Sequence, residues 1–131
     1  MNYRGTIIEE SLSNKSVLNE VKILGQTISP VTEKSKTPWL KQWTKDDVEI
    51  SEARADLVAE MLSQAIEFDH HSSWYADYWN KITHYIVFKD KFFKIDRSSK
   101  KQYDEAYNYG LSIGIPSYQL RTFEGQKTLR E

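Results

Sequence analysis

The fold is decided by the stretch ITHYIVFKDKFFKI, residues 82–95. Its first seven side chains alternate with the period of two that indicates a β-strand. A short charged link, Lys89–Lys91, then leads into a second apolar run, as in a β-hairpin. A hairpin with a two-residue loop gives both strands one common apolar face, formed by Ile86, Phe88, Phe93 and Ile95. His84 shares this face, so we expect it to be buried with a hydrogen-bond partner.

Three segments upstream of the hairpin are rich in β-branched residues and separated by polar turns: Tyr3–Leu12, Val17–Val31 and Trp39–Ile50. In the second of them Gly25 predicts a bulge, and Pro30 predicts an edge position or a strand end. Together with the hairpin, these segments predict an antiparallel sheet of about five strands.

Two helices are expected beside this sheet. Ser51 is a candidate N-cap for a helix whose apolar residues recur every three or four positions from Leu57 to Ile66. Ser99 and Gln102 have the spacing of a capping box before a second helix. The predicted fold class is therefore α+β. We expect residues 1–121 to form a single domain and the polar residues 122–131 to form a flexible C-terminal tail.

Composition restricts the classes of function. The chain has 131 residues, no cysteine and a formal net charge of −1. Without cysteine it has no disulfides or thiolate ligands, and we expect a soluble cytoplasmic protein. It has no uncharged apolar stretch near the roughly 20 residues of a membrane-spanning helix. The absence of a basic excess argues against a dedicated nucleic-acid binder.

The segment DHHSSWYADYW, residues 69–79, is the best candidate for a functional site because it combines imidazoles, carboxylates and large aromatic rings. Its rings at 74 and 78, and at 75 and 79, are four residues apart and would stack along a helical turn. They fill a core or form the wall of a binding site. The second interpretation gives the following candidate binding residues: Trp39, Trp43, His71, Trp74, Tyr75, Asp77, Tyr78 and Trp79.

Two further functions stay open. Asp69–His71, Asp77 and His84 could form the site of a metal-assisted or acid-base hydrolase, although no metal-ligand spacing or other catalytic motif is present and no cofactor is indicated. Lysines beside Phe92 could bind single-stranded nucleic acid weakly. Glu9 and Glu10 are neighbours in a predicted strand, so they would point to opposite faces of the sheet and make poor partners.

Three stretches of the chain carry a resemblance: YRGTIIEESL at residues 3–12, TPWL at 37–40 with WT at 43–44, and HYIVF at 84–88 continuing through Asp96 and Arg97. In these the chain resembles a family of small uncharacterised microbial proteins. The resemblance covers most of the chain and implies a free-standing domain, but it assigns no catalytic residue.

These observations favour a module that binds a small molecule or a protein through an aromatic-rich surface. The sequence identifies neither the ligand nor the partner, and it leaves homo-oligomerisation open.

Overall fold

The computed structural model describes residues 1–30, 42–66 and 74–129, and its strands form one antiparallel sheet. The strands are β1 Tyr3–Ile8, β2 Lys22–Pro30, β3 Gln42–Ile50, β4 Ala76–Trp79, β5 Thr83–Phe88 and β6 Lys91–Asp96. Their order across the sheet is β2-β3-β1-β4-β5-β6. The predicted α+β class is confirmed, with six strands where about five were expected.

The additional strand is β4, which forms where we expected stacking along a helical turn. That expectation was wrong, because residues 76–79 pair with β1 on one side and β5 on the other. In an extended strand, side chains four residues apart lie on the same face but too far apart to stack as on one helical turn.

The hairpin forms as predicted, with Ile86 opposite Phe93 and a two-residue loop at Lys89–Asp90. Asp90 adopts a φ of 64°, a left-handed conformation that aspartate tolerates better than most residues. Its backbone N–H donates to the carbonyl of Ser63, 2.8 Å away, which attaches the loop to a helix on the sheet.

The main helices of the described chain are α1 Ala55–Ala65, α2 Lys100–Ser112 and α3 Phe123–Gln126, with short 3-10 turns η1 Glu9–Ser11, η2 Lys15–Glu20, η4 Glu52–Arg54 and η5 Ser117–Gln119. α1 begins later than expected, because Ser51 precedes η4 and its side chain makes no capping bond. Leu57, which we placed on the apolar stripe, is 48% exposed. At α2, the Ser99 hydroxyl accepts the Gln102 N–H as predicted, but the Gln102 side chain accepts from Asp96 instead of completing the box.

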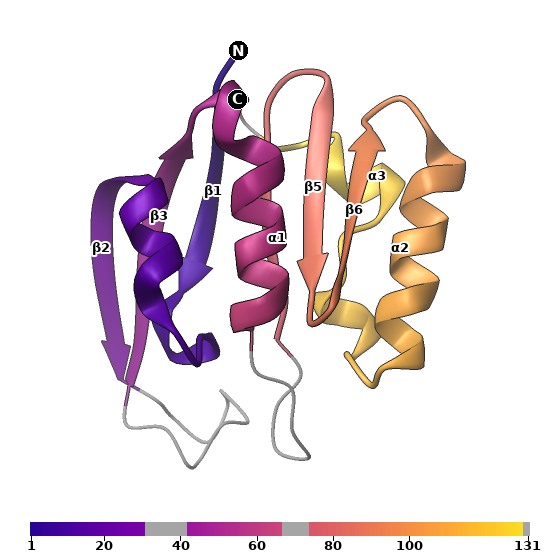
Figure 1. The fold of residues 1–131 in the computed structure, drawn as a ribbon. Coiled ribbons are helices and arrows are strands. Elements are labelled where there is room, and N and C mark those ends of the chain that lie inside the picture. The colour runs from indigo at the N-terminus through magenta and orange to yellow at the C-terminus, as the bar shows by residue number, and fades with distance from the viewer. Residues whose placement is uncertain (31–41, 67–73, 130–131) are drawn as a thin grey trace.

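The sheet separates two hydrophobic cores. α1 and η2 cover one face, while α2 and the segment that follows it cover β5 and β6 from the other (Figure 1). Tyr85 and Val87 belong to the α1 core, whereas Ile86 and Phe88 belong to the α2 core. β5 is therefore buried on both faces.

The segment 122–131, for which we expected a flexible tail, contains α3. Gln126 is 3% exposed there, and its side chain and carbonyl oxygens accept hydrogen bonds from Arg97 at 2.9 and 3.0 Å. These bonds attach the described part of the segment to the end of β6. Residues 130–131 lie outside the described chain, and the flexibility of the tail stays a prediction.

Candidate functional site

The alternation of β4 divides the predicted aromatic site between the two faces of the sheet. Tyr78 is buried in the α1 core, where its hydroxyl donates to the carbonyl of Ala55 at 2.6 Å, and Trp74 packs against the same core. The remaining three candidates near β4, Tyr75, Asp77 and Trp79, alternate with these residues and contact the C-terminal part of the chain.

The other candidate residues lie in β3 or outside the described part of the chain. Trp43 lies in β3, which runs beside β1 and β2. Trp39 and His71 lie outside the described residues, as do Asp69 and His70 of the proposed hydrolase site.

Asp77 is the centre of a buried polar network. One of its oxygens, Oδ2, accepts hydrogen bonds from His84 Nε2 at 2.8 Å and from Arg121 Nε at 2.6 Å. The second ring nitrogen of His84, Nδ1, lies 2.8 Å from the hydroxyl of Tyr103. With Nε2 protonated, Nδ1 accepts from this hydroxyl, so the neutral imidazole has both nitrogens bonded. Tyr103 and His84 are completely buried and Asp77 is 7% exposed.

The pKa values in this network agree with these bonds. Burial raises the pKa of Asp77, but the bonds and charges of His84 and Arg121 outweigh it, so the pKa lies below its ordinary value. Burial lowers the pKa of His84, against the opposing influence of Asp77. The network therefore contains an ionised Asp77 and a neutral His84 at neutral pH. Burial also raises the pKa of the Tyr103 hydroxyl to about 12, so it remains protonated.

The outer end of the network reaches the protein surface at Arg121, whose side chain is 35% exposed. Its guanidinium lies 5.4 Å from the centre of the Trp79 ring, within the range of a cation–π contact. On the neighbouring strand, the exposed Arg4 is paired with Trp79 in the β1–β4 register. We call Arg4, Trp79 and Arg121 the Trp79 surface. Sequence reasoning missed both arginines, because neither forms a motif with residues 69–79 and only the folded sheet brings them together.

A second carboxylate site lies where η1 meets β2 and β3. Glu9 and Glu10 belong to η1, so their placement in a strand was wrong. Asp46 on β3 is completely buried, and Gln26 Nε2 donates at 2.9 Å both to its Oδ1 and to Glu9 Oε2. A hydrogen bond with Asp46 raises the pKa of Glu9. The carboxyl groups of Glu9 and Asp46 therefore lie close together, and this proximity favours the protonated form of Glu9.

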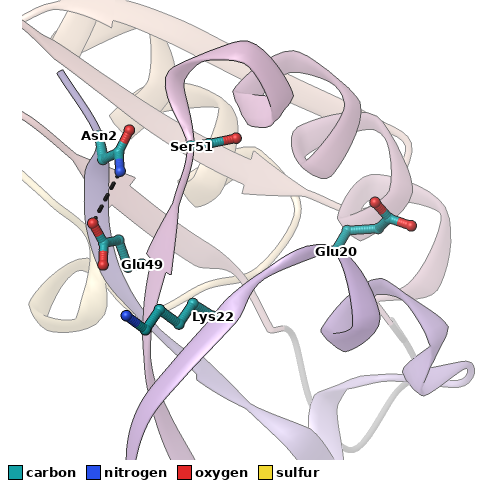
Figure 2. A pocket seen from close by; sticks show the side chains of 5 residues that line it. All are labelled: Asn2, Glu20, Lys22, Glu49 and Ser51. Carbon is teal, nitrogen blue, oxygen red and sulfur yellow. Dashed lines mark hydrogen bonds between the residues drawn. The ribbon is translucent and has the colours of Figure 1, made fainter.

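The pocket in Figure 2 lies at the ends of β2 and β3 and is lined by Asn2, Glu20, Lys22, Glu49 and Ser51. Its volume of about 320 Å³ is at the lower limit for a ligand site. Asn2 donates to Glu49 at 3.0 Å, and Glu20 forms an ion pair with Arg54, so both carboxylates have partners within the protein. None of the predicted site residues lines it.

No group of three histidine or acidic side chains in the described part of the chain is arranged to hold a metal ion. No helix among the described residues is long and apolar enough to cross a membrane. Comparisons of this chain with protein-family models, curated proteins and solved structures each found no significant match. The function must therefore be argued from the chemistry of these residues.

Proposed function

We propose that this protein is a binding module that recognises an anionic group of a small molecule or partner protein on the Trp79 surface. The observation that carries the proposal is the arrangement of Arg121, which a buried carboxylate holds against an indole ring. Asp77 accepts from Nε, and within the described residues no other acceptor is bonded to this guanidinium. The Nη donors are consequently available to a carboxylate or phosphate.

Two neighbours of Arg121 support the same chemistry. Trp79 contributes a partly exposed ring beside this guanidinium, and Arg4, which is opposite Trp79 in the β1–β4 register, adds a second positive charge to the same face of the sheet. Arg4 forms no ion pair within the described chain, although Glu49 lies opposite it in the β1–β3 register. An anion bound here would therefore lie beside Arg121 and Trp79, on the face of the sheet that also carries Arg4.

Binding is favoured over hydrolysis by the state of His84. A general acid or base must reach its substrate directly or through a water molecule. His84 is completely buried, and both of its ring nitrogens have protein partners. We therefore infer that the Asp77–His84–Tyr103 network positions Arg121 and does not act as a catalytic group.

The nucleic-acid alternative has less support, because it needs a continuous lysine stripe with Phe92 pointing outward. Phe92 is half-buried against the α1 core, 6.3 Å from the ring of Tyr85. Lys94 lies over Tyr85, whereas Lys91 lies over Phe93 and Tyr109 on the opposite face. The hairpin lysines are thus divided between the two faces of the sheet.

Benzoate is a suitable first probe, since it combines a carboxylate with a planar ring. Titrated into ¹⁵N-labelled protein, it should shift the amide signals of residues 4, 79 and 121, with an affinity on the order of 1 mM for so small a ligand. Acetate, which has no ring to stack on Trp79, should bind more weakly. Trp79→Ala should remove the preference for benzoate, and Arg4→Gln should weaken the binding of both anions.

Lys127→Gln is a matched control. Lys127 also lies over a ring, 4.6 Å from the centre of Phe123, but it pairs with the exposed Glu124 instead of a buried carboxylate. This variant should bind benzoate as the wild-type protein does. Shifts confined to the pocket around Lys22, or no shifts at millimolar concentrations, would contradict the proposed function.

A further inference from the structure

β2 is an edge of the described sheet, and between its first and last residues it carries neither a charge nor a proline. It pairs with β3 on one side only, and no other described strand pairs with its outer side (Figure 1). Native proteins usually keep edges short or place charges and prolines along them. β2 is nine residues long, and its one charge, Lys22, and its one proline, Pro30, are its first and last residues.

The outer edge also carries apolar surface. Ile23, Leu24 and Ile28 are 46, 40 and 56% exposed, and they are three of the eight large hydrophobic side chains that are exposed in the described chain. At the opposite edge, β6 has lysines at positions 91 and 94 and contacts α2. The unpaired backbone of β2 and its apolar side chains together are typical of a strand that pairs with another chain.

The sequence of β2 is complementary to itself. In antiparallel pairing about a two-fold axis at Gln26, the centre of Lys22–Pro30, all nine residues overlap. Leu24 of each copy then lies opposite Ile28 of the other, and Lys22 lies opposite Pro30, so the two positive charges are at opposite ends. A shift of the axis to residue 25 or 27 shortens the overlap and separates the apolar pair.

We propose that the outer edge of β2 binds the same edge of a second copy of this chain, so that the two sheets join into one. The residue at the axis is already fixed, because the Gln26 amide bonds to both Glu9 and Asp46 at 2.9 Å. The bulge between Ile23 and Gly25 interrupts pairing with β3 only near the start of the strand. From Gly25 to Pro30 the register with β3 is regular, so the residues around the proposed axis are regular, and Ile28 of each copy lies opposite the bulged Leu24 of the other.

The oligomeric state tests this proposal directly. Sedimentation velocity of the purified full chain should give a monomer–dimer equilibrium across about 1–500 μM, with no larger species, because a two-fold pairing is closed. Ile28→Lys and Leu24→Lys place charges at the new contact and should each weaken dimerisation at least ten-fold. Ile82→Lys is the matched control, since Ile82 is 63% exposed in the turn before β5. This variant should dimerise like the wild-type protein.

The register can be tested by crosslinking, because the chain contains no cysteine. At the proposed axis, the two Cα atoms of residue 26 lie about 5 Å apart, within the range that a disulfide spans. The two copies of residue 27 are roughly 8 Å apart, given the strand spacing and rise, and exceed it. Gln26→Cys should therefore oxidise to a covalent dimer much faster than Thr27→Cys.

The proposal would be overturned by a wild-type protein that stays monomeric at about 500 μM, by equal dimerisation of Ile28→Lys and Ile82→Lys, or by faster crosslinking through residue 27 than through residue 26. A monomer that instead binds an unrelated extended peptide along β2 would also overturn it. None of these results bears on anion binding at the Trp79 surface, so the two proposals fail separately.

Discussion

Replacing Asp77 by asparagine tests how much the buried network contributes to stability. The substitution keeps the shape of the side chain but removes the charge that bonds to His84 at 2.8 Å and to Arg121 at 2.6 Å. Breaking a buried ion pair costs about 3–5 kcal/mol, because one charge is left without compensation. We expect the lower end of this range, since Arg121 is 35% exposed and can regain contact with water.

A loss of 3 kcal/mol should be easy to detect. An unfolding entropy of about 2.1 cal/mol/K per residue amounts to about 0.28 kcal/mol/K for 131 residues, so the melting temperature should fall by about 11 °C. Urea denaturation followed by circular dichroism would give the free energy of unfolding. The control is Glu124→Gln, which makes the same chemical change in an exposed pair with Lys127 and should cost no more than about 0.5 kcal/mol.

The pH dependence gives a second check. The native pKa of Asp77 lies below its ordinary value of 3.8, so its charge stabilises the fold above that pH. The difference between the wild-type protein and Asp77→Asn should therefore be constant near neutral pH and decrease as the pH falls through the native pKa. A loss below about 1 kcal/mol at pH 7, or a difference that increases in acid, would refute the assignment of an ionised Asp77 paired with Arg121.

Two further predictions concern other parts of the sheet. Gly5→Ala should destabilise the protein by at least about 2 kcal/mol in the same urea assay, because a Cβ atom at Gly5 would lie 2.3 Å from the backbone oxygen of Asp77. The control is Gly25→Ala, which should destabilise the protein far less because its Cβ atom would meet nothing within 4 Å. Glu9→Gln should raise the free energy of unfolding at pH 7 by about 1 kcal/mol, because the amide removes a negative charge beside Asp46 and can donate a hydrogen bond to it. Because the native pKa of Glu9 is raised, its contribution to the stability of the wild-type protein is greatest below pH 4.5 and is lost as the pH rises through the native pKa. The stability gained by Glu9→Gln should therefore vanish in acid.

The hairpin and the two larger helices could be predicted from the sequence because their signals are local. Alternation gave the correct face for Ile86, Phe88 and Ile95, and the burial of His84 followed from its place on that face. The position of β2 at an edge, with its bulge, followed from Gly25 and Pro30. In each case the residues that produce the structural feature lie within about ten positions of it in the sequence.

β4 and the Trp79 surface could not be predicted in this way. The sequence ADYW does not show the alternation of apolar and polar residues that marks a half-exposed strand, because β4 is covered on both faces. The spacing of its aromatic residues also fits a helical turn. Arg121 bonds to a residue 44 positions earlier, and Tyr103 bonds to one 19 positions earlier. These contacts depend on the strand order and on the path of the chain after α2, which no local pattern specifies.

The position of β5 between two cores has a consequence for how this sequence tolerates substitution. Its last five residues, His84 to Phe88, are all buried, with neighbours alternating between the α1 core and the α2 core. A saturation mutagenesis library selected for folded protein should therefore be depleted of polar variants at every one of these positions. β2, with exposed side chains from Lys22 to Ile28, should accept them widely. Homologous sequences should vary least in this strand, because it has no solvent-facing side.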